Sequence, residues 1–304
     1  MRARQKKRQQ MRRMTIIITI VIIAASLAIG IYFVATANGA SVLDKQIGQP
    51  LSSADMASLQ SAGDQPYGPA PTTNMQAAVY KFASTPFISN GKPVVVYIGA
   101  EYCPYCAVER WAIIMALERF GNVTSLHYTT SANDEGDFAT YTFVGSSYTS
   151  NYIAFRPYEA EDRAQNPLQT PPSNYSTVWS NFGSGFPFVN FGNTYVLKGS
   201  LLADPGVLAG KNWTAIFNDI STYDSTGVQI REAANLITGV ICKITQGAPV
   251  AVCSAPPIGG VTSGISGPAQ AGLSIPTVSS AAQGPTPSRP LGARRFGQGW
   301  YASS

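Results

Sequence analysis

Apolar and polar positions alternate along the middle of the chain in a pattern that predicts a mixed α/β domain. Five apolar residues in a row, 94–98, indicate a buried strand that starts at Lys92-Pro93, because proline is tolerated at the first residue of a strand. Apolar side chains then recur at helical spacing, which predicts a helix over residues 107–120 with Gly121 as its stop. That spacing is made by Trp111, Ile114, Met115 and Leu117.

Further strands and helices follow from the same kind of pattern. Residues 125–130 read as a second strand, residues 140–158 as further extended segments, and residues 131–136 and 166–173 as loops. Residues 185–197 read as a hairpin that turns at Gly192-Asn193, with Pro187 at the start of its first strand. Helices are predicted over residues 212–220 and 226–244.

The segments on either side of this domain differ from it in composition. Residues 38–91 form an N-terminal extension, with a short predicted helix over 55–60 capped by Ser52 or Ser53 and a turn-rich loop over 63–73. Residues 255–304 are dominated by Gly, Pro, Ser and Ala, so we expect a disordered tail. The folded domain is therefore predicted to occupy residues 92–254.

The N-terminus carries the pattern of a membrane anchor. Seven basic residues crowd positions 1–13, and residues 14–37 are uncharged and rich in Ile, Val, Leu and Ala. Because about 20 apolar residues span a bilayer as a helix, we predict a single-pass anchor in the cell membrane. The basic segment would be a cytoplasmic tail, and the body of the chain would be extracytoplasmic. A signal peptide cut near Ala35-Thr36-Ala37 is the alternative.

The net charge of +5 does not favour nucleic-acid binding. Apart from positions 1–13 and three arginines in the last sixteen residues, 11 basic residues face 16 acidic ones, so the body of the chain is acidic. We therefore expect no nucleic-acid partner. Three Asn-x-Ser/Thr triplets in this exterior body predict glycosylation, at Asn122, Asn174 and Asn212.

The candidate chemistry is concentrated in Cys103-Pro104-Tyr105-Cys106, between the predicted strand and the predicted helix. Unpaired backbone N–H groups and the helix dipole favour a thiolate at the first cysteine, and a thiolate is the attacking species in thiol–disulfide exchange. The alternatives are a static disulfide and part of a zinc site. Zinc needs four ligands, and only Cys242, Cys253 and His127 remain as further donors of the usual kind. We expect a redox-active dithiol with no metal and no cofactor.

The remaining candidates have simpler interpretations. Cys242 and Cys253 are near neighbours in an exported domain, which favours a structural disulfide, with a pair that shuttles electrons to or from Cys103 as the alternative. We expect His127 to be structural. Glu109 and Arg110 are expected to be solvated, although an Arg110 that reaches the Cys103 thiolate is the alternative reading.

Several of these residues carry a resemblance to known families. Ala100-Glu101-Tyr102-Cys103 resembles the Ala-Glu-Trp-Cys that precedes the thioredoxin active site, and Cys103-Pro104-Tyr105-Cys106 is the version typical of glutaredoxins. Residues 42–253 resemble an archaeal family of membrane-anchored thioredoxin-like proteins of unassigned function. The resemblance implies a thioredoxin-like α/β fold with an insertion around residues 131–180, a helical C-terminal extension and one preceding transmembrane helix.

The resemblance also implies roles for single residues. Cys103 would be the attacking thiol, Cys106 the resolving thiol, and Pro187 the cis-proline that faces them. Phe186, Tyr102 and Tyr105 would contact the substrate. Thioredoxins carry a buried acid near the position of Tyr97, so Glu101 becomes the candidate for proton handling here.

Together these inferences predict a membrane-anchored, extracytoplasmic thiol–disulfide oxidoreductase, oxidase- or isomerase-like, that acts on exported proteins. Its partners would be the thiols and disulfides of those proteins and a redox partner in the membrane. The sequence does not set the direction of electron flow. The alternative is a non-catalytic surface module of the same fold, in which both cysteine pairs are structural disulfides.

Overall fold

The computed structural model describes residues 45–64 and 67–265, together with residues 14, 18, 19, 21, 25 and 26. The predicted basic tail 1–13 lies outside these residues, as do most of the predicted anchor 14–37 and the predicted tail from residue 266 onward. Within the described part of the chain, no helix combines the length and the apolar character that crossing a bilayer requires. The anchor therefore stays a prediction.

A mixed β-sheet forms the centre of the molecule. Its middle strand is β3 (Lys92–Gly99), which pairs in parallel with β8 (Ala154–Glu159) and antiparallel with β9 (Phe188–Phe191). Beyond β9 lie β10 (Tyr195–Lys198) and β1 (Val79–Lys81), and the short β2 (Ile88–Ser89) pairs with the start of β3. Because helices cover both faces, the side chains of β3 from Val94 onward are buried on both sides, as its unbroken apolar run predicts.

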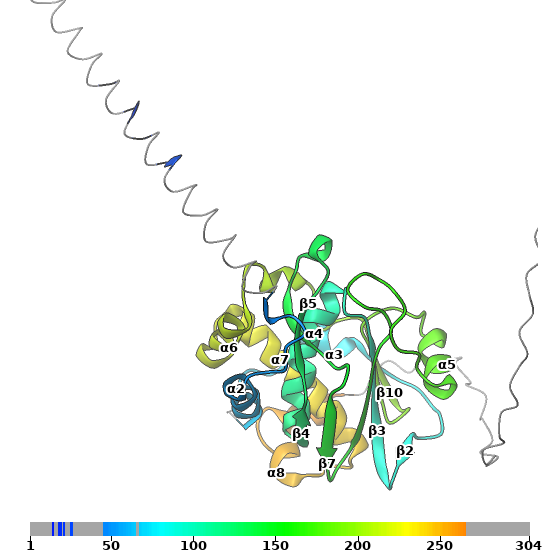
Figure 1. Ribbon diagram of the computed structural model, residues 1–304. Coiled ribbons are helices and arrows are strands. Elements are labelled where there is room, and N and C mark those ends of the chain that lie inside the picture. Colours follow the sequence, from blue (N-terminus) through cyan, green and yellow to red (C-terminus); the bar gives the residue numbers. More distant parts are fainter. Residues whose placement is uncertain are drawn as a thin grey trace, which may run out of the picture.

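Helices cover the two faces of the sheet unequally (Figure 1). One face carries α4 (Pro104–Glu118) and α7 (Ser225–Ile244), whereas the other carries α5 (Ser173–Asn181). Around α4 and α7 lie the remaining helices, namely α2 (Ser53–Asp64), α3 (Thr73–Ala77), α6 (Trp213–Thr222), α8 (Val250–Cys253) and α9 (Ile258–Gly264). The helix that follows the cysteine motif is thus buried in the larger of the two cores.

Along the chain, the segment between α4 and β8 forms two small antiparallel ladders. One joins β4 (Gly121–Thr124) to β7 (Ser147–Ser150), and the other joins β5 (His127–Thr130) to β6 (Ala139–Thr142). Short 3₁₀ turns cover Asn133–Glu135 and Pro205–Leu208. The predicted extended segments of residues 140–158 are therefore present, but they are distributed over three separate strands.

The hairpin and both C-terminal helices were predicted correctly, whereas several other boundaries were wrong. The predicted strand 125–130 is present but begins only at His127, because Ser125, with a φ of 57°, departs from extended backbone. The central helix ends at Glu118, and Gly121 already belongs to β4. The helix predicted over 55–60 is longer and covers residues 53–64, so the first residues of the loop predicted over 63–73 are helical. Its first turn is capped by Ser52, whose hydroxyl accepts a hydrogen bond from the Asp55 N–H at 3.0 Å.

The folded part also extends beyond the predicted limits 92–254. Strands β1 and β2 come from the segment that was predicted as an extension. They belong to the folded domain because β1 pairs with β10 and β2 pairs with β3. At the other end, α9 packs on α7 through Ile258 and Val261, so residues 258–264 are a helix and not the start of a disordered tail.

Cys242 and Cys253 form a disulfide, with their Cα atoms 5.6 Å apart. The bond links the last turn of α7 to α8, and both cysteines are buried in the larger core. This is the pairing that the sequence predicted.

Candidate dithiol site

Cys103 and Cys106 lie at the N-terminus of α4, where the chain leaves the central strand. Cys103 is the N-cap residue, and its Sγ accepts a hydrogen bond from the Cys106 N–H at 3.2 Å. Pro104 occupies the first turn, where a missing N–H costs nothing. Both cysteines are free thiols; Cys103 keeps 6% exposure and Cys106 none. Of the two cysteines, only Cys103 therefore keeps any exposure to solvent.

The two thiols have opposite acidities. The pKa of Cys103 is lowered, first by a hydrogen bond from the Cys106 thiol and also by the Cys106 and Tyr105 N–H groups and the charge of Arg110, while burial opposes the shift. The pKa of Cys106 is raised well above its usual range, chiefly by burial and then by its bond to Cys103. Cys103 is therefore the more readily deprotonated of the two thiols, and Cys106 the one that keeps its proton to higher pH.

A buried ion pair lies behind the motif. Arg110 on α4 donates from Nη2 to Glu159 Oε2 at 2.7 Å and from Nε to Glu159 Oε1 at 3.0 Å, and neither side chain is exposed. Arg110 Nη2 also donates to the Ala100 carbonyl at 2.7 Å, which in turn accepts from the Cys103 N–H at 3.3 Å. Arg110 is thus tied to the backbone turn that presents Cys103.

The expectation that Glu109 and Arg110 are solvated is wrong. Glu109 is fully buried, and its Oε2 accepts from the Ser200 hydroxyl and from the Leu201 N–H, both at 2.8 Å. Burial raises its pKa to about 7, against the effect of these two hydrogen bonds. The segment after β10 that contains Ser200 and Leu201 covers Glu109, and the end of β8 and the turn at Ala100 cover Arg110.

Tyr97 and Glu101 occupy the two positions considered for proton handling. The Tyr97 hydroxyl is buried without a hydrogen-bond partner, and it lies so close to Gly99 that a Cβ there would be 2.0 Å from the oxygen. Glu101 is partly buried, and burial raises its pKa. A fully buried acid, Glu159, lies at the end of the neighbouring strand, where it pairs with Gly99.

Phe186 approaches the cysteines from the segment just before β9, and Pro187 follows it in the chain. The Phe186–Pro187 peptide bond is cis, as the resemblance implied. The Phe186 ring packs, together with Tyr102, against the buried cluster of Ala100, Cys103 and Cys106. Tyr105 lies beside the motif with 43% of its surface exposed. The residues predicted to contact a substrate are therefore gathered around Cys103.

The other predicted sites lie apart from this cluster. Asn122 on β4, Asn174 on α5 and Asn212 at the N-cap of α6 are all exposed. His127 is half-buried on β5. Within the described residues, no three His, Cys, Asp or Glu side chains lie close enough together to hold a metal ion.

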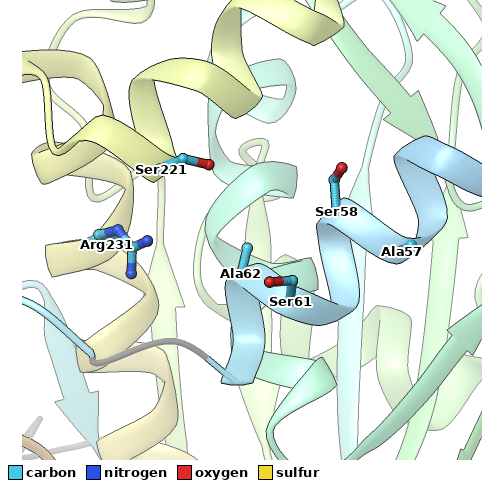
Figure 2. A pocket seen from close by; sticks show the side chains of 6 residues that line it. All are labelled: Ala57, Ser58, Ser61, Ala62, Ser221 and Arg231. Carbon is cyan, nitrogen blue, oxygen red and sulfur yellow. The ribbon is translucent and has the colours of Figure 1, made fainter.

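The largest of the described pockets, about 380 Å³, does not include the cysteines. It lies between α2, α6 and α7 and is lined by Ala57, Ser58, Ser61, Ala62, Ser221 and Arg231 (Figure 2). Ser58 and Ser221 donate their hydroxyl protons to backbone carbonyls four residues earlier, and Arg231 Nε donates to the Ile220 carbonyl. These polar groups therefore have partners within the protein.

Sequence reasoning missed two residues of the site. Glu159 was not singled out, because the apolar pattern around it does not distinguish it from Glu161 two positions later. Trp179 on α5 was also missed, although its ring stacks on Phe186 with the ring centres 5.3 Å apart. The parallel pairing of β8 with β3 is the signal that would have placed Glu159 beside the motif.

The fold and the site define a class: a mixed α/β protein with a free dithiol at the N-terminus of its central helix. The chain matches the family model described as a domain of unknown function (DUF929) over residues 78–243. Because this match covers more than half of the chain, the protein belongs to the DUF929 family. No curated protein and no solved structure matches the chain.

Proposed function

We propose that this protein is a membrane-anchored, extracytoplasmic thiol–disulfide oxidoreductase that oxidises or isomerises disulfides in exported proteins. The observation that carries the proposal is the asymmetric thiol pair at the start of α4. Cys103 keeps slight exposure and has a lowered pKa, whereas Cys106 is fully buried and has a pKa raised well above its usual range. Such a pair suits an attacking thiol and a resolving thiol.

The arrangement of the sheet supports a thioredoxin-like assignment. Strand β3 leads into the cysteine motif and α4, β8 runs parallel to β3, and β9 and β10 follow as an antiparallel hairpin. Helix α7 then packs on α4. This order and these strand directions resemble the thioredoxin fold, with the two small ladders as an insertion.

In the oxidising direction, the Cys103–Cys106 disulfide is the oxidant. A substrate thiolate attacks Cys103 Sγ, so that a mixed disulfide forms and the Cys103–Cys106 bond breaks, and Cys106 takes up a proton. A second substrate thiolate attacks the first substrate sulfur, which forms the substrate disulfide and releases Cys103 as a thiolate. Two electrons pass from the substrate dithiol to the protein, and a disulfide of a membrane redox partner then accepts them.

The lowered pKa of Cys103 favours this direction of electron flow. A stabilised thiolate makes the reduced form of a dithiol more stable and is a good leaving group in the final step. The predicted anchor and the three glycosylation sites are consistent with exported substrates, and both belong to the proposal.

A trapping experiment tests the proposal. The full-length Cys106→Ala chain, purified in detergent, is incubated with a peptide that carries a single cysteine as a mixed disulfide with a small thiol. We expect a stable adduct on Cys103, identified by peptide mass spectrometry, and no adduct in the Cys103→Ala chain. If Cys103 stayed unmodified while the protein remained folded, the cysteines would not be an exchange site and the non-catalytic module would be the better account.

A further inference from the structure

We propose that the surface around Cys103 selects cysteines flanked by an apolar or aromatic residue on one side and a basic residue on the other. This inference rests on the proposed function and names the class of polypeptide segment that would be its substrate. Its basis is a row of aromatic rings that ends in a group of carboxylates.

The aromatic part of the surface consists of three rings in sequence. Tyr102 meets Phe186 edge-on with the ring centres 6.5 Å apart, and Phe186 stacks on Trp179 at 5.3 Å. Each ring is partly exposed. Trp179 is held in place, since its Nε1 donates to the Gly185 carbonyl at 3.0 Å. Rings that are fixed by the protein bind an apolar side chain at a low cost in conformational entropy.

The acidic part of the surface is attached to the backbone of the motif itself. The Glu101 N–H donates to the Glu161 carbonyl at 2.9 Å, and the Ala132 N–H donates to the Tyr102 carbonyl at 3.0 Å. The second bond places the turn with Glu135 beside Tyr102, because the Glu135 N–H donates back to the Ala132 carbonyl. The Glu135 side chain is exposed, and that of Glu161 is partly exposed.

The electrostatics of Tyr102 agree with this placement. Burial, then the charge of Glu161, the two thiols and finally Glu135 raise the pKa of its phenol. The nearby Arg163 does not cancel these charges, since it forms an ion pair with Asp137 at 3.2 Å. At the other end of the surface, Lys198 lies beside Gly183, in the turn that follows Trp179.

The surface therefore has a direction. Carboxylates lie at the Tyr102 end, apolar rings lie at the Phe186 and Trp179 end, and both Tyr102 and Phe186 pack on the cluster that contains Cys103. Charge complementarity assigns a lysine or arginine of the substrate to the first end. The stacked rings assign an apolar or aromatic residue to the second end.

Stopped-flow kinetics with short cysteine peptides test the inference on the oxidised full-length chain. Eight peptides combine lysine or glutamate on one side of the cysteine with tryptophan or serine on the other, each combination in both orders. Each rate is divided by the rate of the same peptide with bis(2-hydroxyethyl) disulfide, which corrects for the reactivity of the peptide thiol. At low salt we expect lysine to react about tenfold faster than glutamate, and tryptophan about fivefold faster than serine.

Two variants connect these preferences to the surface. The double variant Glu135→Gln/Glu161→Gln should lose most of the preference for lysine while keeping that for tryptophan, and Trp179→Ala should do the opposite. Glu232→Gln, which changes an acid on α7, is the matched control and should leave both preferences intact. Equal normalised rates for all eight peptides would overturn the inference while leaving the proposed function standing. A chain that no thiol reduces, dithiothreitol included, would instead contradict the proposed function.

Discussion

Two charged residues, Arg110 and Glu159, are completely buried close to the Cys103 turn. Arg110 and Glu159 form a bidentate pair without exposure to solvent, and Arg110 holds the carbonyl to which the Cys103 N–H is bonded. Removing one member of such a pair leaves the other charge buried and uncompensated. The pair therefore links the stability of the domain to the geometry of the thiol.

We expect Glu159→Gln to lower the free energy of unfolding by about 3–5 kcal/mol, because it strands the buried guanidinium of Arg110. Glu161→Gln is the matched control; its side chain is partly exposed and no ion pair is found for it among the described residues, so its effect should stay below about 1 kcal/mol. Urea denaturation of the two chains measures both values. Equal losses in the two variants would show that the pair does not contribute in this way.

Glu109 makes stability depend on pH. Its pKa rises from an ordinary value of 4.5 to about 7 in the folded protein, so the folded state binds more protons than the unfolded state between these values. Stability should therefore fall as the pH rises through this range, by about 3 kcal/mol at most. Glu109→Gln should make the profile measured by urea denaturation at pH 4.5 to 8 less steep. An unchanged slope in the variant would assign the dependence to other groups.

At the scale of elements, the position of α4 explains most of the site. Residues Cys106–Leu117 of this helix are buried on every side, because the sheet lies on one face and α7, α2 and the ladders cover the others. Its N-terminus is thus held at one place relative to β3 and β9. Helices of this core approach each other closely where glycine removes the side chain.

Gly227 in α7 marks one such approach, since a Cβ there would lie 2.0 Å from the Asp219 carbonyl oxygen of α6. Gly227→Ala should therefore destabilise the protein by about 1–3 kcal/mol or more, because backbone atoms must move. Gly260→Ala in α9 is the control, with no atom within 4 Å of the new Cβ, and should be neutral or slightly stabilising. Melting temperatures of both chains measure the difference, and a stable Gly227→Ala chain would contradict the close packing.

The elements also show how far sequence reasoning reached. The apolar run of β3 and the hairpin at Gly192-Asn193 are local signals, and both were read correctly. The burial of Glu109 and Arg110 was not predicted. Charged residues usually mark the solvent-exposed face of a helix, but α4 is surrounded by neighbours and has no such face over these residues. The places of Glu159 and Trp179 depend on contacts between distant segments, which one sequence does not contain.

For the molecule as a whole, the two cysteine pairs differ in setting. Cys242 and Cys253 are bonded inside the larger core, whereas Cys103 and Cys106 are free thiols at the edge of α4. The sheet extends from β1 to β8, and α9 closes the core near residue 264. The disulfide therefore fastens the C-terminal helices to the domain that carries the dithiol.

Replacing both Cys242 and Cys253 by alanine should cost about 2–3 kcal/mol of stability, since the bond closes a short loop. The rate of exchange at Cys103 should stay within about twofold of the parent chain if the bond is structural. Thermal unfolding and the stopped-flow assay measure the two quantities. A large loss of rate in a chain that remains folded would instead make this pair an electron shuttle.

The central claim is that Cys103 and Cys106 form a redox-active pair. The most direct test is the reduction potential of this pair in the full-length chain, measured by equilibration with thiol–disulfide buffers and mass spectrometry of alkylated cysteines. We expect a value well above about −300 mV for Cys103–Cys106, and a value below it for Cys242–Cys253. A potential below about −300 mV for both pairs would contradict the account and make the first pair a structural disulfide as well.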